Sequence, residues 1–237
     1  MKKSVFIVIP AYKEEANIAK VVASIPKEFK VAGRVFGTKV IVIDDGSSDA
    51  TYEEARKTRA IVLRHVANSG AGAATRTGLR YAEQHSAEVA YVITIDGDGQ
   101  HSATDIEKLL HHAVVHHSRM IVGNRLHRGN KDSIPAHRKF GNWGLNLISR
   151  VLFGVTAKDS QSGLRLFSAD ILPLISYYTL DRYGFCTETL WQAKQHKIRV
   201  DEVPIEVKYS EETMANGQNP WGGVELVRDL FWIRIAG

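Results

Sequence analysis

The sequence lacks several features that would assign it to particular classes of protein. It has one cysteine in 237 residues, Cys186, so no disulfide can form within the chain. No apolar run approaches the roughly 20 residues that a membrane-spanning helix requires, and residues 1–10 are not expected to act as a signal peptide. Internal repeats and low-complexity tracts are also missing. We therefore expect a protein of the cytoplasm and exclude integral membrane proteins, disulfide-rich secreted modules and fibrous proteins.

The composition is that of an ordinary globular protein, with 44% hydrophobic and 24% charged residues. The net charge of +5 is unevenly distributed. Residues 119–150 contain seven Lys or Arg and one Asp, which gives this segment +6 and leaves −1 for the remainder. A local basic region indicates an anionic partner, for which a membrane surface and a phosphorylated substrate are candidates. Nucleic acid is not expected as a partner, because no basic motif with interleaved aromatic residues is present.

Strands and helices alternate in the first half of the chain. Apolar, β-branched runs at 4–9, 39–43 and 91–95 each end in a turn or a carboxylate, as buried strands of a parallel sheet do. Amphipathic segments between and after them predict helices at 14–25, 49–59, 72–84 and 103–117. This pattern predicts an α/β fold with a mostly parallel, Rossmann-like central sheet flanked by helices. Ligands of such sheets bind at the carboxyl ends of the strands.

The second half is less regular. It predicts strands at 121–122, 164–167 and 198–203, and helices at 134–153, 188–196 and 224–235. Residues 210–223 are polar and rich in helix-breaking residues, which predicts a mobile loop. No linker divides the chain, so we expect one domain over 1–237, with a donor-binding half at 1–100 and an acceptor-binding half at 101–237.

Asp96-Gly97-Asp98-Gly99-Gln100 is the strongest local signal for chemistry. Two carboxylates one residue apart can converge on a hard cation where the backbone turns, and glycine permits the turn. Mg²⁺ or Mn²⁺ held by two carboxylates takes its other ligands from phosphate and water. An acidic turn that caps a helix is the plainer interpretation, but the preceding apolar strand favours metal binding.

Three further motifs allow both a structural and a functional interpretation. The acidic turn at 44–49 can place Asp45 on a nucleobase or ribose while its later residues cap the next helix. The small, Gly-rich turn at 68–74 can cradle a phosphate or pack tightly against a neighbour, and the sequence does not decide between these. Four histidines at 111, 112, 116 and 117 favour a solvated helix face, because zinc requires three or four convergent ligands.

Six motifs in this order make the chain resemble a known family. They are Ile9-Pro10-Ala11-Tyr12-Lys13-Glu14-Glu15, Asp44-Asp45-Gly46-Ser47, Asn68-Ser69-Gly70, Asp96-Gly97-Asp98-Gly99-Gln100-His101, Gly123-Asn124-Arg125 and Asp159-Ser160-Gln161-Ser162-Gly163-Leu164-Arg165. The chain resembles family 2 glycosyltransferases of GT-A fold, and within them the polyprenyl-phosphate sugar transferases related to dolichyl-phosphate mannose synthase. The resemblance extends from about residue 5 to residue 208. It implies an inverting, metal-dependent glycosyltransferase that uses a UDP- or GDP-linked sugar.

The resemblance also implies a role for individual residues. The residues expected to bind the nucleotide are Pro10, Tyr12, Glu14, Asp44, Asp45, Arg76 and Asp96. Those expected to hold Mg²⁺ or Mn²⁺ are Asp96, Asp98 and Gln100. Arg125, Arg138 and Lys208 are expected to bind the acceptor phosphate. Asp159 and Glu188 match acidic positions of the catalytic site.

The acceptor remains open between a polyprenyl phosphate and a saccharide hydroxyl. A hydroxyl must lose a proton, so Asp159 would then be a general base, whereas a phosphate is already ionised and needs cations to bind it. The +6 segment favours the phosphate, with Asp159 as a positioning group. A face bearing Phe140, Trp143 and Leu147 beside these cations can meet a membrane surface or belong to the core. A sugar nucleotidyltransferase is a further alternative, although it would need a Gly-rich basic signature where residues 10–15 lie.

Overall fold

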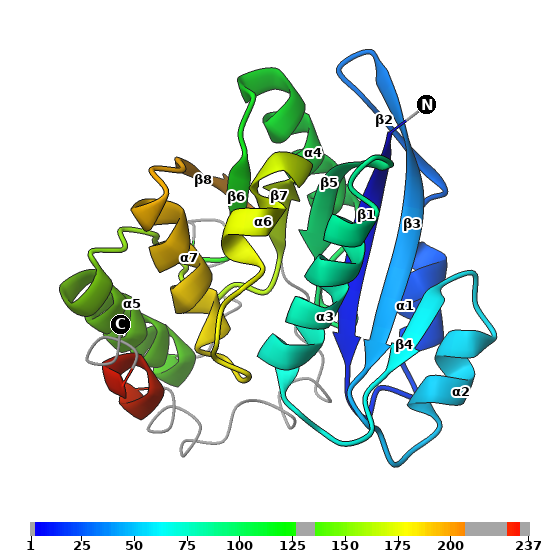
Figure 1. Cartoon of the computed structure of the whole chain (residues 1–237), viewed down its shortest axis with the longest axis horizontal. Helices are drawn as coiled ribbons and strands as arrows, with labels where there is room; N and C mark the ends of the chain where they lie inside the picture. Colours follow the sequence, from blue (N-terminus) through cyan, green and yellow to red (C-terminus); the bar gives the residue numbers. More distant parts are fainter. Residues whose placement is uncertain (1–2, 127–135, 207–226, 233–237) are drawn as a thin grey trace.

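The structure is a computed structural model that describes residues 3–126, 136–206 and 227–232, with the backbone alone for 136–142. Its centre is an eight-stranded sheet in the order β2-β3-β1-β5-β7-β6-β8, with β4 paired to β3 (Figure 1). The strands are β1 Ser4–Ala11, β2 Glu28–Val31, β3 Arg34–Asp44, β4 Ile61–Arg64, β5 Val89–Thr94, β6 Met120–Asn124, β7 Arg165–Ser168 and β8 Val200–Pro204.

The sheet is mixed, which confirms the α/β class and refines the expected strand pattern. Four pairings are parallel, β1 with β3, β1 with β5, β3 with β4 and β6 with β8. Three are antiparallel, β2 with β3, β5 with β7 and β6 with β7. All strands except β2 and β7 therefore run in one direction. Their carboxyl ends meet at one edge of the sheet, and the segment that precedes β7 reaches this edge too.

Helices cover both faces of the sheet (Figure 1). They are α1 Ile18–Ser24, α2 Thr51–Arg56, α3 Ala71–Gln84, α4 Ala103–His116, α5 Ala136–Phe153, α6 Leu172–Ile175 and α7 Phe185–Gln195. Alternate residues of β1 enter different cores. Val5, Ile7 and Ile9 pack with α1 and α4, whereas Phe6 and Val8 pack with α3, α6 and α7. Both faces of β1 are buried, as its unbroken apolar sequence predicts.

The backbone of α3 approaches the sheet closely at Gly78. A Cβ atom built there would lie 2.3 Å from a methyl carbon of Val8 and 2.8 Å from Ile43. Only glycine leaves room for this contact. The close approach places the amino end of α3 beside the carboxyl ends of β1 and β3, where the candidate site lies.

The predicted elements agree with the structure, with several differences in extent. Strand β3 is longer than expected, because it also forms a hairpin with β2 through a turn at Ala32 and Gly33, both with positive φ. The sequence reading missed β2, β4 and α6. The predicted final helix at 224–235 is observed over 227–232, and the predicted loop at 210–223 lies outside the described residues. The expected division into a donor-binding half at 1–100 and an acceptor-binding half at 101–237 stays a prediction.

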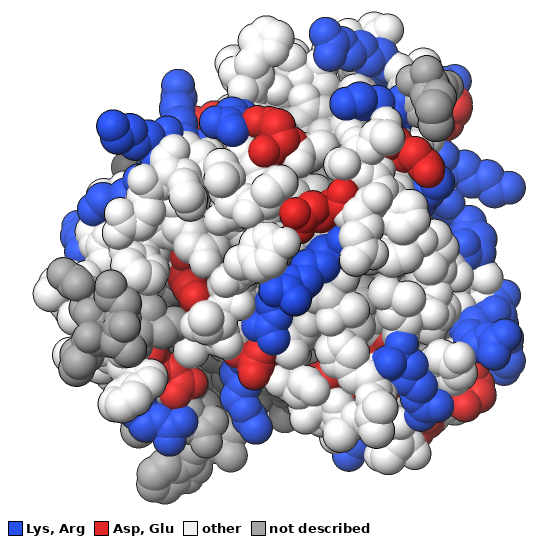
Figure 2. Space-filling model, in the orientation of Figure 1, with Lys and Arg blue, Asp and Glu red and all other residues white. Residues whose placement is uncertain are grey.

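None of the helices in the described ranges is long and apolar enough to cross a bilayer. Lys and Arg side chains on the face seen in Figure 2 are scattered among acidic and uncharged residues. Much of the +6 segment falls at 127–142, where side chains are not described. Of the basic residues that are described there, Arg119 pairs with Asp170 and Arg125 with Asp159.

Candidate active site

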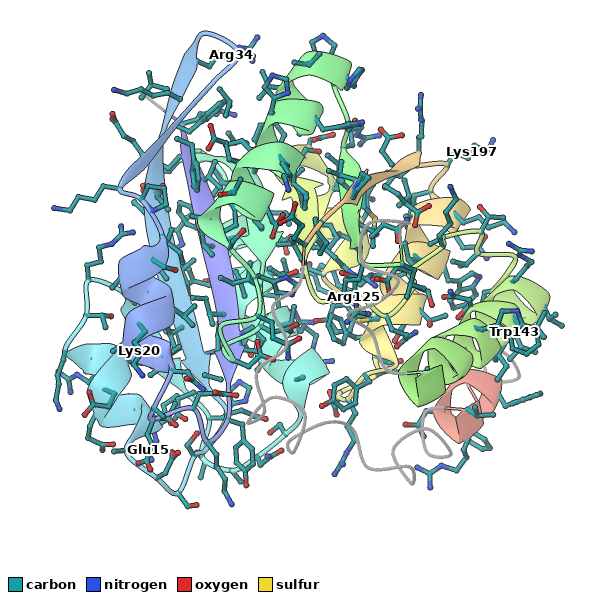
Figure 3. All side chains as sticks on the ribbon, turned by 180° about the vertical axis from the view of Figure 1, so that it is seen from behind. Glu15, Lys20, Arg34, Arg125, Trp143 and Lys197 are labelled. Atoms are coloured by element: carbon teal, nitrogen blue, oxygen red, sulfur yellow. The ribbon has the colours of Figure 1, made fainter. Side chains whose placement is uncertain are left out.

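The carboxyl ends of β1, β3, β5 and β6 carry the polar residues of the site. In the sheet register Ala11 lies opposite Asp44, and the amide of Asp45 donates to the carbonyl of Ala11 at 2.8 Å. Asp96 follows β5 by two residues, and Arg125 follows β6 directly. In Figure 3, Arg125 lies toward the middle of the molecule. The sheet thus gathers residues that are far apart in the sequence.

Three carboxylates, Glu14, Asp96 and Asp98, form the acidic part of the site. Desolvation raises the pKa of Asp98, and the charge of Asp96 raises it further. Desolvation also raises the pKa of Glu14, where a hydrogen bond from Asn17 opposes it and the charges of Asp98, Asp49 and Asp96 add to it. These shifts show that the carboxylates repel one another. Such a cluster gains stability when a cation binds to it.

Asp96 is partly buried and remains accessible to water. Its side chain is 46% exposed, yet desolvation by surrounding atoms has the largest single influence on its pKa. A hydrogen bond from His101 and the charges of His101, Arg125 and Arg165 outweigh that influence, so its pKa lies below the ordinary value. Asp96 is therefore an accessible carboxylate in a locally positive surrounding.

These residues fit a divalent cation that is completed by a substrate. Among the described residues, no three His, Cys, Asp or Glu side chains are grouped so that they could hold a metal ion alone. Mg²⁺ needs only one or two protein carboxylates when phosphate and water supply its other ligands. Asp96 and Asp98 provide this donor set. The backbone and side-chain nitrogens of Gln100 donate to Asp98 at 3.0 and 2.6 Å, and the expected contact of Gln100 with a metal ion stays a prediction.

Arg125 and Asp159 form a buried ion pair beside this cluster. Asp159 is 1% exposed and accepts hydrogen bonds from the backbone amide, Nε and Nη2 of Arg125 at 2.9, 2.8 and 2.8 Å. Glu202 holds the backbone of Lys158 and Asp159 from the other side. Both oxygens of Asp159 are thus engaged in fixing the guanidinium of Arg125. This arrangement supports the positioning role that was one of the two alternatives for Asp159.

Arg165 is fully buried and organises the loop that carries Asp159. Its guanidinium donates to the carbonyls of Ser160, Ser162 and Cys186 and to the hydroxyl of Thr189, at 2.6 to 2.9 Å. A buried charge is costly unless it is hydrogen-bonded. Arg165 therefore ties residues 160–162 to α7 and adds positive charge near Asp96.

Glu188, predicted as a catalytic acid, has structural contacts. Its Oε1 accepts from the amide and hydroxyl of Thr179 at 2.8 and 3.1 Å, and its Oε2 accepts from the amide of Leu180 at 2.9 Å. The side chain is buried. Glu188 thus holds the loop before α7 in place, and a catalytic role for it stays a prediction.

Asp44 and Asp45 are both buried and engaged. Asp45 accepts from the amides of Ser69 and Gly70 at 3.0 and 2.7 Å, and its Oδ1 lies 2.7 Å from His65 Nδ1. Asp44 accepts from the amide of Ser47 at 3.2 Å, and its other oxygen lies 3.0 Å from Arg64 Nε. These contacts shape the walls of the predicted nucleoside pocket. Contact of either aspartate with a nucleotide stays a prediction.

The Gly-rich turn before α3 packs against the loop that Glu188 holds. A Cβ atom at Gly70 or Gly72 would lie 2.5 or 2.4 Å from a carbonyl oxygen of that loop, and the amide of Ala73 donates to the carbonyl of Asp181 at 2.9 Å. This supports tight packing, one of the two alternatives for this turn. Arg76 donates to Tyr178 and Asp181 of the same loop, at 3.1 and 2.5 Å.

The structure describes some of the remaining predicted site residues and not others. Pro10 lies at the end of β1, and the ring of Tyr12, 41% exposed, has Lys13 Nζ 5.4 Å from its centroid. An exposed aromatic ring here can stack on a nucleobase. The side chain of Arg138 and the whole of Lys208 lie outside what the structure describes, so their role stays a prediction.

Sequence reasoning missed several residues that build the site. His101 contacts Asp96, with 3.3 Å between Nε2 and Oδ2, and His65 links Asp45 to Thr77. Glu202 and Arg165 fix the Asp159 loop. His101 and Arg165 stand within motifs already singled out, so their positions offered a signal. Nothing in the local sequence marks His65 or Glu202, whose contacts depend on the fold.

Comparison with known proteins agrees with this geometry. The family model "Glycosyl transferase family 2" matches residues 6–173. The chain therefore belongs to glycosyltransferase family 2 and is a glycosyltransferase.

Two relatives with named activities bear on the substrate. A UDP-N-acetylglucosamine–dolichyl-phosphate N-acetylglucosaminyltransferase of Methanococcus voltae is 34% identical, over 99% of this chain and 97% of the relative. A human dolichyl-phosphate β-glucosyltransferase is 27% identical, over 98% of this chain and 75% of the relative. An uncharacterized protein of Methanocaldococcus jannaschii is 35% identical, over 99% and 93%.

Solved structures show the same fold. Glucosyl-3-phosphoglycerate synthase of Mycobacterium tuberculosis, in complex with Mn²⁺, UDP and glucosyl-3-phosphoglycerate, superposes with a TM-score of 0.68. The match covers 97% of this chain and 77% of that chain at 18% identity. The same enzyme with Mg²⁺ and UDP gives 0.66. The likeness establishes a GT-A-like fold for the present chain.

The contacts of Glu188 lead to a first prediction. Glu188→Gln places an amide NH₂ group against N–H or O–H donors, so we expect a loss of about 1–3 kcal/mol in the free energy of unfolding. Urea denaturation measures it. The matched control is Glu107→Gln on the exposed side of α4, which should leave stability unchanged. Full stability of the Glu188 variant with loss of turnover would instead assign the residue to catalysis.

Proposed function

We propose that this glycosyltransferase moves a sugar from a UDP-linked donor to a polyprenyl phosphate such as dolichyl phosphate, in a reaction that depends on Mg²⁺ or Mn²⁺. The observation that carries the proposal is the arrangement at one sheet edge of an accessible carboxylate pair, Asp96 and Asp98, beside the buried Arg125–Asp159 pair. The first pair suits a cation on a diphosphate, and the second suits an anionic acceptor.

The donor side of the proposal rests on the acidic cluster and on the relatives. The Methanococcus voltae relative is named for a UDP-linked sugar, and the Mycobacterium tuberculosis enzyme binds UDP with Mn²⁺ or Mg²⁺. Asp96 and Asp98 would hold the metal ion, which would supply positive charge to the diphosphate leaving group. Tyr12 and the loop fixed by Asp45 would enclose the nucleoside.

The proposal of a phosphate acceptor rests on the hydrogen bonds that Asp159 accepts. A hydroxyl acceptor requires a general base with an oxygen available for its proton. Both oxygens of Asp159 accept hydrogen bonds from Arg125, so the carboxylate orients the guanidinium instead. A phosphate acceptor is already ionised and needs no base. Its oxygen would attack the anomeric carbon from the side opposite the diphosphate, which inverts the configuration, while Arg125 orients it through charge-assisted hydrogen bonds.

A lipid-linked acceptor also requires contact with a membrane, and α5 offers a suitable surface. Trp143, Leu147 and Val151 recur every four residues on this helix and are 60%, 44% and 72% exposed. Figure 3 shows Trp143 on α5 near the edge of the molecule. The core alternative therefore fails for Trp143 and Leu147. Phe231 and Trp232 of the helical segment 227–232 are also exposed, at 48% and 71%, and Leu230 of that segment is buried in the hydrophobic cluster against which Leu145 and Ile148 of α5 pack.

Metal dependence is tested through binding of UDP. With Mn²⁺ and UDP at 100 times its dissociation constant, the wild-type protein should gain about 2.7 kcal/mol, or about 5–11 °C in melting temperature. Asp98→Asn should remove this gain, which is measured against the melting temperature of the same variant without ligand. Asp170→Asn, which makes the same charge change at an exposed ion pair, is the control. An equal gain in excess chelator would refute metal dependence.

The acceptor is tested with two lipids that differ in one group. Wild-type protein receives a radiolabelled UDP-sugar with either dolichyl phosphate or dolichol. We expect labelled lipid with dolichyl phosphate alone, since Asp159 is engaged and cannot accept the proton of dolichol. Transfer to dolichol or to a saccharide hydroxyl, with Asp159→Asn inactive, would assign the chain to the group that acts on hydroxyl acceptors.

Membrane contact is tested by sedimentation with vesicles that contain anionic lipid. We expect binding that weakens as salt rises, because the attraction between basic residues and lipid is screened over about 8–10 Å. Trp143→Ser should weaken it roughly tenfold, since partial burial of an aromatic ring contributes about 1.4 kcal/mol. Tyr177→Ser, at a similarly exposed ring on another element, is the control. Equal loss in both variants would exclude α5 as the contact surface.

A further inference from the structure

Gly163 lies directly against the carboxylate of Asp96. A Cβ atom built on Gly163 would lie 2.4 Å from Oδ1, 2.7 Å from Oδ2 and 2.8 Å from Cγ of Asp96. A Cβ atom does not approach other heavy atoms this closely, so any side chain at position 163 must displace either the carboxylate or its own backbone.

The backbone at Gly163 is held in place. Its carbonyl accepts a hydrogen bond of 2.7 Å from the hydroxyl of Thr94 on β5, and the next carbonyl, that of Leu164, accepts from the amide of Gly123 at 2.9 Å. On the other side, Arg165 Nε donates to the carbonyl of Ser162 at 2.9 Å. The loop is thus fixed on both sides of Gly163, and the carboxylate of Asp96 is the group that would move.

The carboxylate of Asp96 has neighbours on two sides and is accessible to water elsewhere. His101 Nε2 lies 3.3 Å from Asp96 Oδ2 and Gly163 packs against the same carboxylate, while the side chain is 46% exposed, so a new Cβ atom at position 163 would push the carboxylate away from its present position. Gly163 does not have a positive φ. An alanine there would consequently be strained by the contact with Asp96 and not by its own backbone conformation.

We propose that Gly163 is a positioning residue for cation binding, because the absence of its side chain sets where the Asp96 carboxylate stands beside Asp98. The inference rests on the proposed function for the identity of the bound group, Mn²⁺ with UDP. The inference also connects the two sides of the proposed site. The loop that carries Asp159, on the acceptor side, determines the position of the Asp96 carboxylate, which is a proposed metal ligand on the donor side.

The first test measures Mn²⁺ affinity in the presence of UDP, by the electron paramagnetic resonance signal of free Mn²⁺. Gly163→Ala should weaken the affinity roughly 10–100-fold, as changes to groups that orient metal ligands do, and should raise the Mn²⁺ concentration needed for half-maximal turnover. Gly37→Ala on β3, where the nearest atom to a new Cβ is Ser4 Oγ at 3.4 Å, is the matched control. Unchanged Mn²⁺ affinity in a folded Gly163→Ala protein would overturn the proposal.

The second test is a double-mutant cycle in thermal stability without metal or nucleotide. Gly163→Ala should lower the melting temperature in the wild-type background but not in Asp96→Ala, because the shorter side chain removes the obstacle. If Gly163→Ala does not fold alone, folding of the double variant supports the contact and failure of both overturns it. A wild-type protein that binds neither Mn²⁺ nor UDP would refute the proposed function, and the cycle would still decide whether Gly163 positions Asp96.

Discussion

The active site depends on one buried charge, the guanidinium of Arg165. It is fully buried, and its acceptors are three carbonyl oxygens and one hydroxyl. Those acceptors belong to the loop before β7 and to α7, so the charge can be satisfied only when these two segments are in their native places. The same loop carries Asp159 and Gly163. Because the buried guanidinium of Arg165 must keep these hydrogen bonds, it fixes the loop in place. The ion pair of Asp159 with Arg125 and the contact of Gly163 with Asp96 both depend on the position of this loop.

The acidic residues of the site differ in whether a cationic side chain pairs with them, and this difference explains the different roles that we propose for them. Asp159 has a cationic partner within the chain, whereas the charge of Asp96 repels that of Asp98 and the side chain of Asp96 is accessible to water. A paired carboxylate is suited to hold a neighbour, and an unbalanced pair is suited to bind a cation that arrives with the substrate. The chemical roles in the proposed function follow from this difference in partners and not from residue type.

The sequence predicted the α/β class, the main strands and the residues at the strand ends, because apolar runs and acidic turns are local signals. It missed β2, whose hairpin turn uses Ala32 at positive φ in place of a typical Asn-Gly pair. It did not reveal the structural contacts of Glu188, because only the fold brings Thr179 and Leu180 to that carboxylate. The partners of His65 and Glu202 are likewise distant in sequence, so local patterns cannot reveal them.

The antiparallel strand β7 has a consequence for how the chain tolerates change. Thr94 of β5 lies opposite Arg165 of β7 in the sheet register, so backbone pairing, together with the contacts of the Arg165 side chain, fixes the segments around Asp96 and Asp159 relative to each other. The chain between them forms α4, β6 and α5, and it also holds the Asp159 loop, through Arg125 after β6 and through Asn146 of α5, whose Oδ1 accepts from the amide of Ser160 at 3.1 Å. The connection between β5 and α4 carries Asp98 and Gln100, so a change in its length would disturb the site, whereas a change in length between Arg125 and α5 would leave the contacts of Asp96 and Asp98 in place. In the proposed function, the surroundings of the acceptor can therefore differ between related chains while the residues at the carboxyl end of β5 stay the same.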